Sequence, residues 1–534
     1  MPSVFILGAG LMQRPAVEAA HKLGFTAVVA DGNPKAPCAP LADTFVHIDL
    51  KDREALLEYA CTLKDGLKAV FTAGTDFSAS VSYVAEKLGL KSHSFEASLN
   101  ASDKIRMRRA FKEHNVPSPV FTEVTSAAWN EMLSDCAHAE EAAEKLLKTA
   151  GFESFPLVIK PVDNMGGRGC RMINSADELS PAITDALKYS RSGRAILEDY
   201  MNGPEFSIDA IVFNGEVTVT GFADRHIYFP PYFIEMGHTM PTDISREDWN
   251  ALAECFASGI HALGLTHGVA KADIKLTSRG PMIGEIAARL SGGYMSGWTY
   301  PYASDVFLTE QAMLLALGKE PCEIMRLRQP TDVKNVFTVP AVRTSAERAW
   351  LSIPGKIHDV LGLEDASGTA YVRDVLPRVS AGDTITFPVN NVGKCGNVIT
   401  AAPSRAEAIA AAGHAISSII VRLEPHNPET DAFLNSALDT AYPPSAYNLG
   451  DSVYSEIDRM PREVQFALSA DSVPDILKPY ENSADWNHRT VKEALRQLHS
   501  VLGDCSVSEH DLVRSLVRGG IQGALYILEG EVRK

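Results

Sequence analysis

The chain has 534 residues, of which 45 % are hydrophobic and 22 % charged, and its net charge is −17. This composition excludes a largely disordered chain, a collagen and a coiled coil, and the length predicts about three or four domains. The acidic balance does not suit a protein that holds a phosphate backbone over a broad surface, so we expect no nucleic-acid partner.

The sequence carries no signal for a membrane or for an oxidising compartment. No apolar run reaches the ~18–20 residues that a membrane helix needs, and the initial MPSVFILGAG predicts a buried strand rather than a secretion signal. The eight cysteines contain no Cys-x-x-Cys pair and are expected to be reduced, mostly buried thiols. We therefore expect a cytoplasmic protein with no membrane partner.

Short apolar strands alternate with helical patterns over residues 1–95. Such alternation is typical of a small, doubly wound, Rossmann-like α/β domain. The expected strands are 4–10, 25–34 and 67–74, and the expected helices are 15–23, 52–64 and 76–88.

The turn Gly8-Ala9-Gly10 is followed by Asp31, at about the spacing of a dinucleotide-binding fingerprint. The third glycine of that fingerprint is missing, because position 13 is Gln. A Gly-x-Gly pair alone is a weak signal. We therefore expect a turn within an α/β domain that binds a substrate or no ligand.

Residues 96–320 are expected to form an α+β domain with antiparallel strands. A helix is expected to begin at Ser102-Asp103-Lys104, and Asn-Gly at 214–215 predicts a hairpin turn. A second hairpin is expected to turn near 278–280. The other elements expected here are helices over 126–150 and 247–263 and strands over 154–161 and 196–201.

The last part of the chain predicts two further regions. Residues 321–425 predict a small C-terminal α+β domain that ends in an Ala-rich helix over 404–420, and 426–534 predict a mostly helical extension. Its helix 491–503 carries an apolar stripe, which we interpret as a packing face, with a partner or dimer surface as the alternative. The stripe consists of Val491, Leu495, Leu498 and Leu502.

Lys160 ends an apolar strand, and the glycine-rich run Gly166-Gly167-Arg168-Gly169 follows within ten residues. A glycine loop exposes backbone N–H groups that can surround phosphate oxygens, and a lysine at a strand end adds a fixed positive charge. The run is not a P-loop, because no Gly-Lys-Ser/Thr ends it. An ordinary hairpin turn is the alternative.

Two acidic residues are expected to lie on adjoining strands. Asp273 and Glu285 flank the predicted turn, so their carboxylates can point to one place. Two carboxylates together with nucleotide phosphates are a usual way to hold Mg²⁺. Arg289 follows four residues after Glu285, and an arginine beside a metal suits a developing phosphate charge. A solvated salt-bridge pair is the alternative.

The order of these residues resembles the ATP-grasp superfamily. The resemblance covers roughly residues 1–420 and is greatest to the carboxylate–amine ligase branch, which includes the L-amino acid (dipeptide) ligases. Biotin carboxylase and the carbamoyl phosphate synthase large chain are more distant. The front segment, ILGAGLMQRPAVEAAHKLGFTAVVADGNPKAP with FTAGTDFS, is similar to the pre-ATP-grasp domain of that branch. The ordered residues are Lys104, Lys160, Glu198, Glu205, Asp273, Glu285 and Arg289.

This resemblance implies an ATP-grasp fold, and it implies roles for individual residues. The nucleotide-binding set is Lys104 (phosphates), Lys160 (adenine and α-phosphate), the loop with Gly166, Gly167, Arg168 and Gly169 (β- and γ-phosphates), Glu198, Tyr200 and Met201 (adenine) and Glu205 (ribose). The remaining set is Asp273 and Glu285 (Mg²⁺ ligands), Arg289 (acyl phosphate), and Glu235, His238 and Gly292 (substrate).

Three positions refine the resemblance. Relatives usually carry Asn two residues after the second acid as a further metal contact, whereas this chain has Ala287. After Arg289 the chain has Leu-Ser-Gly-Gly rather than the Val-Glu-His run of biotin carboxylase, which argues against bicarbonate chemistry. His238 lies in YFIEMGHTMP, where its neighbours predict a loop; we expect it to bind substrate or transfer a proton, with a backbone-bound loop histidine as the alternative.

The resemblance implies an ATP-dependent ligase that activates a carboxylate, such as that of an amino acid, as an acyl phosphate and joins it to an amine. Arg289, Lys160 and His238 are the expected catalytic residues. ATP and Mg²⁺ or Mn²⁺ are the expected cofactors, the partners are a small carboxylate and an amine, and a homodimer is expected. The alternatives are another ATP-grasp activity, of the formate, purine-precursor or carbamoyl-phosphate type, and a non-catalytic nucleotide-binding module.

Overall fold

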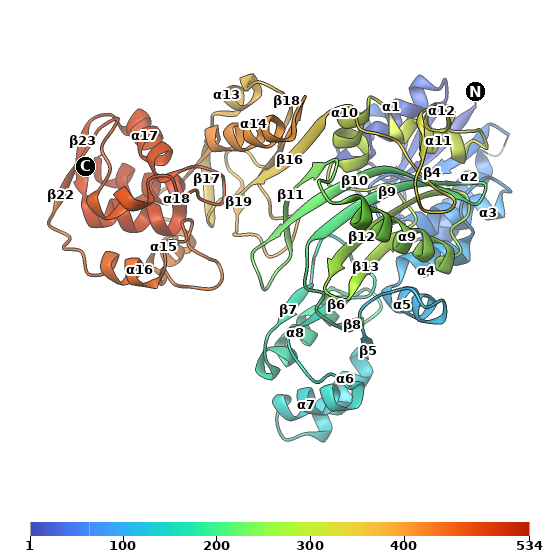
Figure 1. Ribbon diagram of the computed structural model, residues 1–534, viewed down its shortest axis with the longest axis horizontal. Coiled ribbons are helices and arrows are strands. Elements are labelled where there is room, and N and C mark those ends of the chain that lie inside the picture. The colour runs from blue at the N-terminus through green and yellow to red at the C-terminus, as the bar shows by residue number, and fades with distance from the viewer. Residues whose placement is uncertain (1, 64, 533–534) are drawn as a thin grey trace. The chain divides into compact units, whose positions relative to one another are not determined.

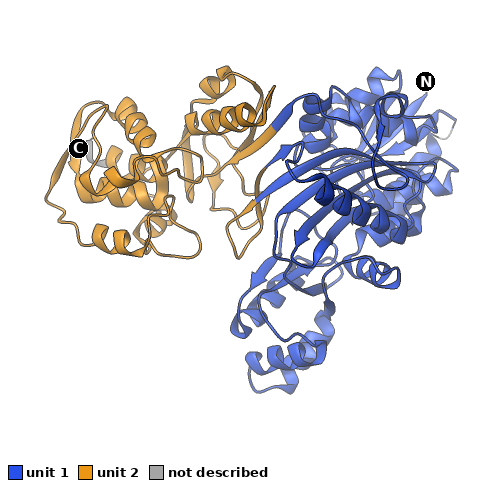
Figure 2. Cartoon of the chain, in the orientation of Figure 1, with its two compact units in different colours: residues 1–226, 238–345 blue, residues 227–237, 346–534 orange. Residues whose placement is uncertain are grey.

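The computed structural model describes residues 2–63 and 65–532 of the chain. Two compact units are present (Figure 2): unit 1 comprises residues 1–226 and 238–345, and unit 2 comprises residues 227–237 and 346–534. Each unit boundary lies within a strand. Within the described residues, no helix has the length and apolar character that crossing a membrane requires.

A four-stranded parallel sheet with the order β3-β2-β1-β4 opens unit 1 (Figure 1). Along β1, Val4 and Ile6 pack into one apolar core and Phe5 and Leu7 into another, so both faces of the sheet are covered. This confirms the doubly wound domain. Its elements are β1 (Ser3–Leu7), α1 (Arg14–Lys22), β2 (Thr26–Asp31), β3 (Thr44–His47), α2 (Arg53–Thr62), β4 (Leu67–Phe71) and α3 (Ser78–Lys87), with 3₁₀ turns at Leu11–Gln13 and Ala39–Leu41.

The Asp31 carboxylate supports the turn that follows β1. It accepts hydrogen bonds from the backbone N–H groups of Ala9, at 2.7 Å, and of Asn33, at 2.8 Å. Because both carboxylate oxygens are engaged by backbone donors, Asp31 here fixes the loop conformation.

A second, antiparallel sheet has the order β5-β8-β6-β7. The prediction of one helix over 126–150 is wrong: two helices, α6 and α7, are separated at Cys136 and His138, which have extended backbones. The stretch 134–138 contains Ser, Asp, Cys and His, which favour helix formation poorly. The elements of this region are α4 (Phe95–Ser102), α5 (Lys104–Glu113), β5 (Phe121–Thr125), α6 (Ser126–Asp135), α7 (Ala139–Ala150), β6 (Leu157–Pro161), β7 (Arg171–Ile173), α8 (Ala176–Tyr189) and β8 (Arg194–Asp199).

The large sheet of unit 1 runs β13-β12-β9-β10, with β15 paired to β10. The predicted hairpin at 214–215 is confirmed: Asn214 (φ 53°) and Gly215 (φ 78°) both have the positive φ that a tight hairpin turn requires. The elements are β9 (Glu205–Phe213), β10 (Glu216–Tyr228), α9 (Arg246–Leu263), β12 (Gly268–Thr277), β13 (Gly280–Ala287), a π-helical turn (Met295–Thr299), α10 (Tyr300–Ser304), α11 (Leu308–Ala316), α12 (Cys322–Leu327), β14 (Gln329–Pro330) and β15 (Val336–Thr338).

Unit 2 contains strands and a largely helical C-terminal part. The predicted Ala-rich helix is present as α14, whose start is fixed by a capping box between Ser404 and Glu407. The elements in or entering unit 2 are β11 (Ile234–Met240), β16 (Thr344–Trp350), β17 (Gly355–Leu361), α13 (Leu363–Gly368), β18 (Val372–Pro377), β19 (Thr384–Ile385), β20 (Gly396–Ala402), α14 (Arg405–Ser418), β21 (Ile420–Leu423), α15 (Pro428–Asn435), α16 (Asp451–Ile457), β22 (Gln465–Leu468), a 3₁₀ helix (Asp475–Tyr480), α17 (Val491–Leu502), β23 (Cys505–Ser508) and α18 (Glu509–Val532).

The apolar stripe of α17 faces the core of unit 2. Val491, Leu495 and Leu498 are each at most 1 % exposed, and they pack in one cluster with residues of α18. The interpretation of this stripe as a packing face is therefore confirmed.

The cysteines are free thiols, but the expectation that most of them are buried is wrong. Three of the eight are buried, namely Cys38, Cys255 and Cys395. Of the others, Cys61 and Cys322 are exposed, and Cys136, Cys170 and Cys505 are partly buried.

His93 joins the first domain to strand β12 within unit 1. Its Nδ1 atom accepts a hydrogen bond from the backbone N–H of His267 at 3.3 Å, so Nε2 carries the proton and donates to the Val269 carbonyl at 2.9 Å. Burial lowers the pKa of His93 to about 4. The imidazole is therefore neutral at neutral pH.

We expect this buried histidine to make folding pH-dependent. His93 binds a proton near pH 6.5 in the unfolded chain but only near pH 4 in the folded chain. The free energy of unfolding therefore decreases by about 3 kcal/mol as the pH is lowered from 6.5 to 4. Urea unfolding of the parent and of His93→Gln at several pH values measures this, and exposed His138→Gln is the control. An equal pH slope in the parent and His93→Gln would contradict the assignment.

Candidate active site

One face of the large sheet of unit 1 carries the acidic residues that the sequence singled out. Side chains alternate along a strand, so Phe206 and Ile208 enter the core on the α9 side, whereas Glu205 and Asp209 face the opposite way. The same alternation directs Asp273 to this second face. The face is the floor of the candidate site.

Asp273 and Glu285 lie directly opposite each other in the register of β12 and β13. A β-bulge next to Asp273 changes the register there, a feature that commonly redirects side chains at functional sites. The placement of both acids on adjoining strands is thus confirmed.

Four cationic side chains act on the Glu285 carboxylate. Burial alone would raise its pKa, but the combined charges lower the pKa to about 2, so the carboxylate is ionised. Two carboxylates on one face are the hard oxygen ligands that Mg²⁺ prefers, and the residues present therefore fit such an ion. The cations, in decreasing order of effect, are Lys104, Lys271, Arg289 and Lys160.

Lys104 connects the acidic face with the glycine loop. Its ammonium lies 3.6 Å from Glu285 Oε1 and donates a hydrogen bond to the Asn164 carbonyl at 3.3 Å. Asp103 caps the start of α5 by accepting from two backbone N–H groups, and this cap places Lys104 at the first position of the helix.

Asp273 is also paired with cations. Arg225 Nη1 lies 2.7 Å from Asp273 Oδ1 and 2.5 Å from Glu205 Oε1, so one guanidinium joins two of the singled-out acids. Lys271 forms an ion pair with Asp273 Oδ2.

Lys160 is held by a buried ion triad. Its ammonium lies 2.8 Å from Glu198 Oε2, and the Arg108 Nε group donates to Glu198 Oε1 at 2.6 Å. Arg108 also donates from Nη2 to the carbonyl of Gly284, the residue before Glu285, at 2.6 Å. The Glu198 carboxylate therefore faces two cations and orients Lys160.

The pairing of Arg108, Glu198 and Lys160 shifts the pKa values of Glu198 and Lys160. Burial alone would raise the pKa of Glu198, but Arg108 and Lys160 lower it below its usual range. Burial alone would lower the pKa of Lys160, but Glu198 raises it above its usual range. All three groups are charged at neutral pH.

The glycine run forms the turn between the paired strands β6 and β7. Gly166, Gly167 and Gly169 have φ values of 70°, 74° and 70°, a region that favours glycine. Arg168 donates from Nε to the Met165 carbonyl at 3.2 Å, which braces the turn from within.

The segment after β8 carries the residues expected near adenine and ribose. Met201 is buried, and the Lys275 ammonium lies 4.9 Å from the centre of the Tyr200 ring. Lys275 also lies 3.4 Å from Glu205 Oε2. The acid expected at the ribose is thus oriented by basic neighbours.

Arg289 and Gly292 adjoin the loop that follows β4. Arg289 Nε lies 3.8 Å from Asp76 Oδ1. A Cβ atom on Gly292 would come within 3.2 Å of the Gly74 carbonyl oxygen, so the two backbones pass close to each other. The first domain therefore contributes a wall beside Arg289.

Asp209 fixes the backbone that follows Arg289. It is fully buried and accepts hydrogen bonds from Ser291 N–H (3.1 Å), Ser291 Oγ (2.8 Å) and Ser296 Oγ (2.7 Å). Three donors on one carboxylate hold the segment with Gly292 in a single conformation.

His238 lies in strand β11, so the expectation of a loop is wrong. Its side chain is 2 % exposed, and Nε2 lies 2.8 Å from Thr299 Oγ1. The adjacent Gly237 lets β11 approach β16, because a Cβ atom there would come within 2.0 Å of the Glu347 carbonyl oxygen. This long-range contact makes the segment extended.

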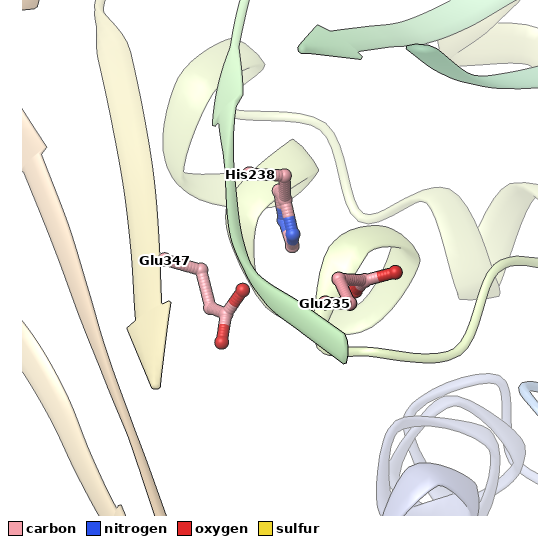
Figure 3. A group of neighbouring side chains, drawn as sticks. All are labelled: Glu235, His238 and Glu347. Carbon is pink, nitrogen blue, oxygen red and sulfur yellow. The ribbon is translucent and has the colours of Figure 1, made fainter. Parts of the chain in front are cut away.

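Glu235, the other expected substrate residue of β11, belongs to unit 2. Its backbone N–H donates to Asn391 Oδ1 and its carbonyl accepts from Lys394 Nζ, both at 2.7 Å. Figure 3 shows the side chains of Glu235 and His238 on β11 together with Glu347 of β16. A ligand oxygen of Glu235 lies within 4.8 Å of one of Glu347.

Arg108, Lys271 and Asp209 are among the site residues that were not singled out from the sequence. Arg108 lies one helical turn after Lys104, Lys271 lies two residues before Asp273, and Asp209 lies four residues after Glu205. These spacings place each residue on the same face as its neighbour, and they are the signals that could have found it.

Family models match three segments of the chain. They are the ATP-grasp domain at residues 153–297, the ribonucleotide synthetase preATP-grasp domain at 1–65, and the L-amino acid ligase C-terminal domain 2 at 349–424. Residues 153–297 are therefore an ATP-grasp domain. The chain has the ATP-grasp fold and is an ATP-grasp ligase-family enzyme.

The relatives of this ATP-grasp protein are distant. An uncharacterized protein, y4rH of Sinorhizobium fredii, is 24 % identical over 422 residues, which cover 77 % of this chain and 81 % of that protein. Carnosine synthase 1 of Gallus gallus is 25 % identical over 342 residues, which cover 60 % of this chain but only 35 % of the synthase. The crystal structure of an L-amino acid ligase from Bacillus licheniformis has a TM-score of 0.64 at 20 % identity and covers 79 % of this chain and 99 % of the ligase.

We expect the buried triad to matter for stability. Arg108→Met leaves the buried Glu198 carboxylate with one cation fewer, and loss of one member of a buried ion pair costs about 3–5 kcal/mol. Denaturant unfolding measures this change. Arg109→Met is the matched control, because Arg109 follows in the same helix but is exposed. Equal stability of the two variants would contradict the role of Arg108.

Proposed function

We propose that this protein is an ATP-dependent ligase that joins the carboxylate of an amino acid to an amine. The convergence of Lys104, Lys160, Lys271 and Arg289 on Glu285 carries this proposal. Such a concentration of positive charge beside two carboxylates suits the phosphates of a nucleotide held with a divalent cation.

The proposed reaction has two steps. A carboxylate oxygen of the first substrate attacks the γ-phosphorus of ATP, the bond to the β-phosphate oxygen breaks, and ADP and an acyl phosphate result. The amine nitrogen then attacks the acyl carbon, inorganic phosphate leaves with the bonding pair, and the nitrogen loses a proton to give the amide. An acyl phosphate is needed because oxide is a poor leaving group.

The chain's own residues position and neutralise charge in these steps. Lys104 and Lys160 hold the phosphates in line, and the backbone N–H groups of the glycine loop cover them and exclude water from the acyl phosphate. Asp273 and Glu285 would hold a Mg²⁺ ion, which neutralises phosphate charge when bound. Arg289 faces the charge that develops at the acyl carbon.

Further roles belong to the same proposal. The backbone and side chains at Glu198, Tyr200 and Met201 line the adenine position, and Glu205 binds the ribose. Gly292, Glu235 and His238 bind the substrates, with His238 as the candidate for proton transfer.

An amino acid as substrate is supported by the C-terminal part of the chain. The match of residues 349–424 to the L-amino acid ligase C-terminal domain favours amide formation over the formate-type activity that is the alternative. Carnosine synthase, by its name, also points to a product that contains an amino acid. A homodimer is part of this proposal and is tested by the mass in solution.

We expect Glu285→Ala and Arg289→Ala each to lower turnover by about 10²-fold or more, because each removes charge stabilisation beside the transferred group. Phosphate release with ATP, Mg²⁺ and pairs of amino acids measures turnover, and mass spectrometry identifies the amide. Arg246→Ala, at an exposed arginine, is the control. Near-normal amide formation in both site variants would reject these roles, and phosphate release without an amide would favour another ATP-grasp activity.

A further inference from the structure

Lys271 lies on the same face of the large sheet as the two proposed metal ligands. It precedes Asp273 by two residues in β12, so both side chains point to one side. In the strand register Lys271 lies directly opposite Ala287, while Asp273 lies opposite Glu285. These are two successive cross-strand pairs on one face of the sheet. Side chains that lie opposite or diagonally opposite each other in such pairs are within reach of one another.

The ammonium of Lys271 is directed to these acids. Its side chain is 13 % exposed and forms an ion pair with Asp273 Oδ2, while Arg225 takes Asp273 Oδ1 at 2.7 Å. Lys271 also lowers the pKa of Glu285, which lies diagonally opposite it on β13. Among the cations, only Lys104 lowers this pKa more. One lysine therefore interacts with both carboxylates.

Position 287 offers no ligand atom. A divalent cation such as Mg²⁺ takes oxygen ligands and keeps near-octahedral geometry, and a second ion beside the first needs oxygen atoms of its own. In the Lys271–Ala287 pair, Ala287 presents a buried methyl group where an oxygen ligand for a second ion would be needed. The residue opposite it is a cation rather than an acid, which repels a second ion.

We propose that the Lys271 ammonium takes the place of a second divalent cation, so that the nucleotide binds with a single metal ion. This inference rests on the proposed function, in which Asp273 and Glu285 hold the first ion. An ammonium has three N–H donors, so Lys271 can bind a phosphate oxygen while it keeps Asp273 as a partner. It supplies positive charge without the oxygen ligands that a metal ion needs.

Metal stoichiometry in the parent protein tests the proposal directly. Electron paramagnetic resonance of free Mn²⁺, titrated with protein and the non-hydrolysable analogue AMP-PNP, counts bound ions without any turnover. We expect one Mn²⁺ per chain in the presence of AMP-PNP. Two bound ions would overturn the inference and leave the proposed function intact, whereas no nucleotide-dependent Mn²⁺ binding would overturn both.

Variants of the second cross-strand pair test the role of Lys271 itself. Ala287→Asn alone adds an oxygen ligand but keeps Lys271, so we expect one bound Mn²⁺. The double variant Lys271→Ala with Ala287→Asn is expected to bind two. Lys271→Ala alone is expected to raise the Kd for AMP-PNP about tenfold or more, because a charged hydrogen bond to phosphate is lost.

Two controls make these outcomes interpretable. Lys68→Ala removes an exposed lysine of strand β4 and should leave both the ion count and the Kd unchanged. Circular dichroism establishes that the variants are folded. A folded double variant that binds one Mn²⁺ would overturn the role of Lys271, and so would Lys271→Ala with an unchanged Kd for AMP-PNP. If the double variant does not fold, the number of Mn²⁺ ions bound by the parent protein decides whether a single metal ion is used.

Discussion

The mutual neutralisation of buried acids and bases holds the candidate site together. Several lysines and arginines must lie within a few ångströms of one place if they are to bind phosphates, and like charges at that spacing repel strongly in a low dielectric. Glu285, Asp273 and Glu198 remove this repulsion by pairing with Lys104, Lys271 and Lys160. The acids therefore stabilise the folded site and also fit the proposed metal ion.

The fold supplies this arrangement from three directions. Helix α5 presents Lys104 and Arg108 one turn apart, the small sheet presents Lys160 and Glu198 on paired strands, and the large sheet presents Asp273. Arg108 contacts Glu198 and also the carbonyl next to Glu285. Through these contacts, the Arg108 side chain fixes the position of the Lys160–Glu198 pair relative to the acidic face.

Local sequence patterns predicted those parts of the structure whose conformation depends on residues close by in the sequence. The Asn214-Gly215 turn needs only its own backbone conformation, and the Asp273–Glu285 pair follows from one short hairpin. The triad was not predicted, since Arg108 and Glu198 lie 90 residues apart. Asp209 likewise meets Ser291 82 residues away.

His238 illustrates the same limit. Its neighbours, including Gly237, have the composition of a loop, and extension of this segment depends on β16, more than a hundred residues later in the chain. A single sequence contains the residues of such a contact but not their pairing.

The ion pairs of the site also bear on how a nucleotide would enter under the proposed function. Phosphate oxygens can replace Glu285 as the partner of Lys104, while a divalent cation replaces Lys104 as the partner of Glu285. Each exchange replaces one pair of opposite charges by another, so no charge is left buried without a partner, which would be costly. Arg108 and Glu198 are fully buried and stay outside this exchange. Fixed pairs thus define the geometry, and exchangeable pairs on the acidic face accept the ligand.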